Sequence, residues 1–242
     1  MAGGGQAMRV AGDSLAWDEL DGTLLDSLHL RGLRLRVPGA AVDIQALKLQ
    51  WQPGSLVSGM VQVDRLAADG ILIVLSDTGD AKSPAEPFDP TRFDLPVGVI
   101  IEALELRDIE LRTGDSAPRR IDNISLAARL QDSRLALERL EILAPEGELV
   151  ASGNIALTEA MPLDLKAQWN WSLADQRQLA GDLEIDGHLD SYRVASAGQL
   201  QVPGQAPTSW SLAARGTLEG LELEPLTVKY MRVSYAKASE LR

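Results

Sequence analysis

The chain has 242 residues, no cysteine and a formal net charge of −12, with 45% hydrophobic but only 4% aromatic residues. The absence of cysteine excludes disulfides and thiolate metal sites. The acidic balance argues against nucleic acid as a partner, because proteins that bind a phosphate backbone gather Lys and Arg into a patch. The longest uncharged apolar run, residues 95–101, is too short to span a bilayer. Any apolar face of this protein is therefore mainly aliphatic.

The chain divides at one stretch rich in Pro, Asp and Gly. We expect an added-looking Gly-rich start at residues 1–8, an N-terminal β segment at 9–76, a linker or loop at 77–90, and a longer β segment at 91–242 that is continuous with the first.

From Leu28 to Tyr235, apolar residues recur at every second position. Side chains of a strand point alternately to opposite faces, so this period of two builds one apolar and one polar face. The run at residues 163–173 shows the pattern most clearly. The sequence therefore predicts an all-β protein with very little helix. We expect an elongated, curled antiparallel sheet with a hydrophobic concave groove.

The apolar period changes once within two of the runs. At residues 28–35 and 104–111 one apolar step covers three residues instead of two. A step of three predicts a β-bulge or a bend, and bulges increase the twist of a sheet and curl it. The apolar face is therefore expected to be the concave one.

Turn signals separate the predicted strands. Asp69-Gly70 and Asp186-Gly187 match the preferred pair of a type I′ hairpin, in which both positions need positive φ. Residues 129–143 have a composition that suits a helix, but their apolar period of two favours two strands joined by a turn at 131–133. Residues 53–58 are expected to form one short helical turn.

No catalytic constellation is visible. The two histidines, His29 and His188, lie in separate segments without a local partner, and both are expected on the solvated face. The alternating acids Asp182, Glu184 and Asp186 are three potential ligands for a hard cation, but a solvated strand face explains them better. No phosphate loop, His-x-x-x-His pair or Gly-x-Ser-x-Gly elbow occurs. The sequence predicts neither an enzyme nor a bound metal or cofactor.

The inward positions of the C-terminal segment are the candidate site. The set includes two tryptophans, which either surround a bound apolar ligand or belong to an ordinary packed core. The sequence leaves both interpretations open. The candidate lining residues are Leu104, Leu106, Ile109, Leu111, Leu126, Leu135, Leu137, Ile142, Leu149, Ile155, Leu157, Leu165, Trp169, Trp171, Leu183 and Ile185.

Several motifs carry a family resemblance. They are GTLL at 22–25, the L-x-G-L-x-L pattern at 30–35, LQWQPGSL at 49–56 and the V-x-x-L-x-x-x-G-I-x-V-x-L pattern at 63–75. In this order they resemble the N-terminal periplasmic region of the TamB family, within the wider AsmA-like group. Residues after the predicted linker resemble the later repeats of that family.

The resemblance implies a fold, a place and partners. Members have one N-terminal membrane helix followed by a long periplasmic β-taco, a sheet bent into a U. The implied function is a bridge between the inner and outer membranes of Gram-negative bacteria that conducts phospholipids, with an older assignment to outer-membrane β-barrel assembly. The chain has neither the membrane helix nor the C-terminal domain expected to meet a TamA-like barrel partner, so we expect an N-terminal fragment of an inner-membrane anchored protein.

Three functional hypotheses remain. The leading one is a conduit in which phospholipid acyl chains slide along the aliphatic wall. The second is a scaffold or chaperone whose strand edges pair with nascent barrel strands. The third, a β-helix enzyme acting on polysaccharide, is weakened by scattered acids and irregular repeat length.

Overall fold

The computed structural model describes residues 15–75 and 97–230, apart from positions 24, 26, 38, 115, 159, 218–219 and 224–226. The strands are β1 (Leu15–Ala16), β2 (Glu19–Gly22), β3 (Ser27–Val37), β4 (Ala40–Gln52), β5 (Met60–Leu75), β6 (Gly98–Thr113), β7 (Arg119–Gln131), β8 (Arg134–Ala144), β9 (Gly147–Ala156), β10 (Pro162–Ser172), β11 (Gln178–His188), β12 (Ser191–Gln201), β13 (Thr208–Thr217), β14 (Gly220–Leu223) and β15 (Thr227–Tyr230). Two short 3-10 helices, η1 (Pro53–Ser58) and η3 (Ala174–Gln176), complete the described elements.

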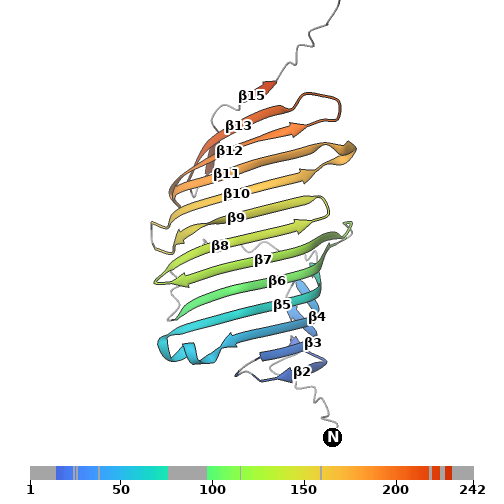
Figure 1. Cartoon of the computed structure of the whole chain (residues 1–242), viewed down its shortest axis with the longest axis vertical. Coiled ribbons are helices and arrows are strands. Elements are labelled where there is room, and N and C mark those ends of the chain that lie inside the picture. The colour runs from blue at the N-terminus through green and yellow to red at the C-terminus, as the bar shows by residue number, and fades with distance from the viewer. Residues whose placement is uncertain are drawn as a thin grey trace, which may run out of the picture.

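All fifteen strands belong to one sheet. Figure 1 shows them stacked one above another in nearly sequential order, from the N-terminal strands at the bottom to β15 at the top. Over the described residues the sheet does not close on itself, and helix is almost absent. The predicted all-β, curled antiparallel fold is thus confirmed.

One strand pair departs from the antiparallel pattern. Strands β5 and β6 pair in parallel, with Met60 opposite Gly98 and Leu75 opposite Thr113. Parallel neighbours need a long crossover connection, whereas antiparallel ones are joined by a tight turn. The connection is residues 76–97, and the predicted linker at 77–90 lies outside the described residues. The sheet continues from β5 to β6 without interruption.

A crease runs across the N-terminal half of the sheet. At this crease the backbone pairing leaves out one residue of each strand from β3 to β7, and these residues follow one another from strand to strand: Gly32, Gln45, Gly70, Asp108 and Asp122. Three of them have positive φ: Gly32 at 60°, Gly70 at 66° and Asp108 at 51°. The bulges predicted at 28–35 and 104–111 are confirmed as parts of this crease.

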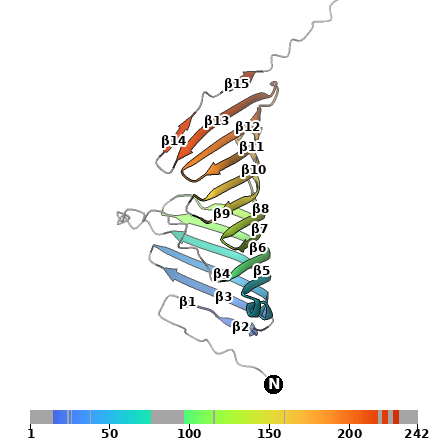
Figure 2. The same cartoon turned by 90° about the vertical axis from the view of Figure 1, so that its left-hand side faces the viewer.

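A second line of irregular pairing crosses strands β4 to β9. The register shifts at Gln50/Trp51, Ile101/Leu104, Ala127/Ala128 and Leu137/Leu140. Two lines of bulges bend a sheet more sharply than twist alone. Figure 2, turned by 90° from the first view, shows the resulting curl.

The apolar face is the inner face of this curl. Ala68, Ile71 and Ile109 are 2%, 6% and 4% exposed and form one cluster at the crease. A sheet one layer thick buries side chains this deeply only where it folds over its own face. The cluster therefore identifies the apolar face as concave.

Two predicted hairpin turns are wrong. Asp69-Gly70 lies inside β5 at the crease, and Asp186-Gly187 lies within β11, so that the turn falls at Leu189–Asp190. The sequence signal was for positive φ, and a glycine with positive φ serves a bulge as well as a turn. Gly70, with φ of 66°, supplies the bend of β5 instead of its end.

The prediction for residues 129–143 is confirmed. This segment forms the end of β7 and most of β8, and the turn between them places Asp132 and Ser133 at φ of 50° and 55°. Two successive positive φ values are those of a type I′ hairpin turn. The predicted short helical turn at 53–58 is η1.

Candidate functional site

Paired residues form a continuous row along the concave face. We call it the central row: Leu20, Leu30, Leu47, Ala68, Leu106, Ile124, Ile142, Leu149, Trp169, Gly181, Gly198 and Trp210. The row crosses the strands and so follows the long axis of the sheet seen in Figure 1. None of its members carries a charge or a hydroxyl group.

A second row runs beside the first. We call it the leucine row: Leu28, Leu49, Leu66, Leu104, Leu126, Leu140, Ala151, Ala167, Leu183, Ser196 and Leu212. Its single polar member, Ser196, donates its hydroxyl to the backbone carbonyl of Asp182 at 2.6 Å. Because that hydrogen bond satisfies the hydroxyl, the row stays apolar in effect.

The structure places the predicted lining residues on or beside these rows. Leu106, Ile142, Leu149 and Trp169 belong to the central row, and Leu104, Leu126 and Leu183 to the leucine row. Among the rest, Leu165 pairs with Ile185 and Leu135 with Ile155, while Leu137, Trp171, Ile109 and Leu111 lie in other rows and Leu157 lies just past the end of β9.

The concave face has two environments. At the crease the sheet bends over its own apolar face, and Ile109 is buried there with Ile71. Of the sixteen predicted lining residues, the other fifteen are half-buried. The described residues place no second layer over these side chains. A contiguous apolar face that stays partly accessible is typical of a surface that binds an apolar partner.

Two tryptophans meet on the central row. The rings of Trp169 on β10 and Trp210 on β13 stack with their centroids 5.8 Å apart and their planes at 27°. Strands β11 and β12 lie between them and contribute Gly181 and Gly198 at the same level. This pair could not be predicted from the sequence, because it depends on the register of three successive strand pairings.

Charged side chains occupy the opposite, convex face. Glu105 accepts hydrogen bonds from Arg65 at 2.8 Å and from Arg107 at 2.7 Å. With His29 and Lys48, these two arginines line a hollow of about 380 Å³. The sequence shows no basic stripe, yet the fold gathers these groups. Because Glu105 compensates both guanidinium groups, the hollow is a weak anion site at best.

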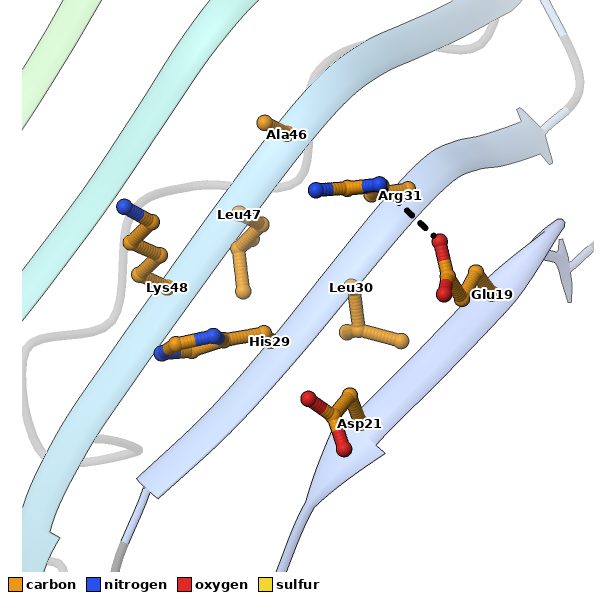
Figure 3. A pocket seen from close by; sticks show the side chains of 8 residues that line it. All are labelled: Glu19, Asp21, His29, Leu30, Arg31, Ala46, Leu47 and Lys48. Atoms are coloured by element: carbon orange, nitrogen blue, oxygen red, sulfur yellow. Dashed lines mark hydrogen bonds and ion pairs between the residues drawn. The ribbon is translucent and has the colours of Figure 1, made fainter. Parts of the chain in front are cut away.

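A smaller hollow lies next to it, near the first strands. Figure 3 shows its side chains, with the Arg31 guanidinium bound to Glu19 at 3.2 Å and with His29 beside Lys48. Its volume is about 90 Å³, which suits a few water molecules and excludes a lipid chain. The outward hollows therefore do not compete with the concave face as an apolar binding surface.

The acids of β11 lie on the convex face and are exposed. Glu184 pairs with Lys166 at 3.4 Å, and its neighbours Asp182 and Asp186 share the same face. Within the described part of the chain, no group of three His, Asp or Glu residues is placed to hold a metal ion. Nor does any helix in the described ranges have the length and apolar character needed to cross a membrane.

A single sheet that curls around an uncovered apolar face defines an open β-groove protein. The family model of the TamB N-terminal domain matches residues 6–117 and 92–182, so the chain belongs to the TamB family. No curated protein and no solved structure matches it significantly. The match gives the chain a TamB-related role in the cell envelope, in a family of structural or transport domains that work with an outer-membrane partner.

Proposed function

We propose that this chain is part of a lipid conduit, in which phospholipid acyl chains move along the concave face between the inner and outer membranes. The observation that carries the proposal is the pair of apolar rows, which run side by side from β3 to β13 without a charged side chain. A site for one fixed ligand needs only a local pocket. Rows that follow the whole length of the sheet suit movement along it.

The energetics favour an acyl chain as the occupant. Burying one methylene is worth about 0.8 kcal/mol, so a segment of several methylenes offsets the cost of ordering it on the wall. The lining offers few polar groups that would hold a chain in place, since Ser196 is already satisfied by Asp182. The head group stays in water on the open side of the curl.

We propose the half-buried candidates, from Leu104 to Ile185, as the lining of the conduit. Ile109 has a different part, because it lies in the buried cluster at the crease. There it packs between the two parts of the sheet that meet at the crease, and it makes little contact with lipid. The site thus consists of a supporting crease and a lipid-facing wall.

The proposed location is the periplasm of a Gram-negative bacterium. We further propose that the conduit is anchored in the inner membrane and meets a TamA-like barrel in the outer membrane. The family membership supports this arrangement. A conduit must receive lipid at one membrane and deliver it at the other, and these two attachments meet that requirement.

The second candidate function is a scaffold for outer-membrane barrel strands. It is favoured by the unclosed sheet, which ends in β1 and β2 on one side and in β14 and β15, both paired with β13, on the other. Open edges present unpaired backbone groups to which another strand can add. In this reading the backbone of the edges binds the partner, and the groove does not.

Site-directed photocrosslinking distinguishes the two functions. A photoreactive amino acid replaces Leu126 on the leucine row or, as the matched control, the exposed Gln168 on β10. The conduit predicts crosslinks to phospholipid at Leu126 and none at Gln168. Equal labelling at both positions, or absence of phospholipid in native mass spectra of the purified protein, contradicts the conduit. Crosslinks from the edge strands to a barrel-strand peptide support the scaffold.

A further inference from the structure

The stacked tryptophans stand in the path that the central row defines. Elsewhere this row consists of Leu, Ile and Ala side chains, but at β10 to β13 its members are Trp169, Gly181, Gly198 and Trp210. The two indole rings reach toward each other over the two glycines and stack at 5.8 Å. An acyl chain that follows the row meets this pair.

The two glycines leave space for the edges of the indole rings. A Cβ on Gly181 would lie 2.7 Å from Cζ2 of Trp169, and one on Gly198 would lie 2.6 Å from Cζ2 of Trp210. Carbon atoms do not approach so closely, so each indole edge occupies the space that a side chain would fill. The backbone carbonyl oxygens of Ala197 and Ala180 would also overlap these two Cβ atoms, so glycine at both positions leaves room for the paired strands as well as for the stacked rings.

The stacked state leaves one polar group unsatisfied. Nε1 of Trp210 is buried and has no hydrogen-bond partner. A buried indole N–H usually finds an acceptor, because an unmade hydrogen bond is costly away from water. An occupant that separates the rings and brings a carbonyl oxygen would remove this cost. The indole N–H of Trp210 therefore lacks an acceptor while the rings are stacked.

We propose that Trp169 and Trp210 form a gate on the groove that recognises ester-linked acyl lipids. The inference rests on the proposed conduit. The acyl chain displaces the ring stack, which is a weak contact compared with the burial of several methylenes. Nε1 of Trp210 then donates its hydrogen to the ester carbonyl oxygen. No covalent bond forms or breaks, and the rings close again when the lipid moves on.

The test compares two ligands that differ only at the acceptor. Binding of a monomeric ester-linked lysophosphatidylcholine and of its ether-linked analogue, which lacks the carbonyl, is measured by calorimetry on the full chain. We expect wild type to bind the ester several-fold more tightly, as one neutral hydrogen bond allows. Trp210→Phe keeps an aromatic ring and removes the N–H, so it should bind both ligands equally. Trp51→Phe, on β4 and outside both rows and the proposed lining, is the matched control and should keep the preference.

A second measurement reports the rings themselves. Two stacked indoles give an exciton couplet in circular dichroism, which Trp169→Phe should abolish in the free protein. The ester ligand should weaken this couplet in wild type as the rings separate. A couplet that is unchanged at saturating ligand overturns the gate.

The outcomes separate the gate from the conduit. If both ligands bind wild type equally, or if the preference persists in Trp210→Phe, the gate is overturned while the conduit stands. If neither ligand binds and Leu126 captures no phospholipid, both proposals fail. Loss of ester preference in Trp51→Phe as well as in Trp210→Phe also overturns the assignment to Trp210.

Discussion

Gly70 on β5 lies against the side chain of Gln45 on β4, at the crease of the sheet. A Cβ on Gly70 would overlap Cδ and Cγ of Gln45, and the backbone φ of 66° is one that L side chains rarely adopt. The φ of Gly70 shows why the crease uses residues that tolerate positive φ. The bend of the sheet, and with it the concavity of the apolar face, depends on such positions.

Alanine substitutions of three glycines should distinguish the cost of a positive φ from the cost of overlap between the added Cβ and its neighbours. We expect Gly70→Ala to lower the free energy of unfolding by about 1–3 kcal/mol, since it adds a Cβ at positive φ and the exposed Gln45 side chain must also move aside. Gly59 has a φ of 72° but open space around its Cβ, so Gly59→Ala should cost about 1 kcal/mol. Gly54 has neither problem and should change stability by less than about 0.5 kcal/mol. Urea denaturation followed by circular dichroism gives the three values.

A similar cost for all three substitutions would contradict a special role of the crease. The shape of the folded Gly70→Ala protein is a further control. Small-angle scattering should show a less curled sheet, if the variant relieves its clash by flattening at β4 and β5.

The ion pairs of the convex face should contribute little to the stability of the fold. Glu105 is 26% exposed in its side chain and holds Arg65 and Arg107 at once, so Glu105→Gln should cost about 0.5–1 kcal/mol at low salt. The more exposed pair of Lys166 with Glu184 should contribute less. Raising the salt concentration should reduce the difference between wild type and Glu105→Gln, because ions screen exposed charges. A loss of several kcal/mol that is independent of salt contradicts this assignment.

The sequence predicted the elements well because each strand buries one face only. In β10 every second residue is exposed, so the period of two appears directly in the sequence from Leu163 to Trp171. A helix-like composition at 129–143 did not obscure this period. The three-residue steps also marked the crease, since a bulge shifts the apolar phase by one residue.

Other features depend on strand pairing, which alternation does not encode. The parallel pairing of β5 with β6 leaves the same apolar pattern as an antiparallel one. The contact of Trp169 with Trp210 requires the registers of β10 to β13 to be known together. The Asp-Gly pairs were misread because positive φ serves a bulge and a turn equally.

The histidines and acids of the convex face should be dispensable. His29, His188 and Asp182 are all exposed and point away from the apolar rows. Alanine at any of them should shift the free energy of unfolding by less than about 0.5 kcal/mol and leave lipid crosslinking at Leu126 unchanged. Thermal melts and the crosslinking yield are the measurements. Loss of crosslinking in a folded variant would reveal a site on the convex face.

Aspartate substitutions should distinguish the supporting crease from the lipid-facing wall. Ile109 is 4% exposed inside the cluster, so Ile109→Asp buries a charge without a partner and should cost about 4 kcal/mol or unfold the protein. Leu165 is half-buried on the wall opposite Ile185, and its aspartate can reach water. Leu165→Asp should cost less than about 2 kcal/mol and remain folded. The same is expected for the half-buried positions Leu126, Leu137 and Ile155, whereas Leu106 packs against the cluster at the crease and should cost more.

The folded Leu165→Asp variant then tests transport. A charge against acyl chains is strongly disfavoured, so phospholipid crosslinking on the C-terminal side of Leu165 should fall while crosslinking at Leu126 persists. Asp164→Asn, one residue away on the convex face, is the matched control and should leave both yields unchanged. Normal crosslinking on both sides of the aspartate would count against movement along this face. Unfolding by aspartate at every wall position would mean that the groove is filled by its own side chains, and the scaffold function would then become the leading candidate.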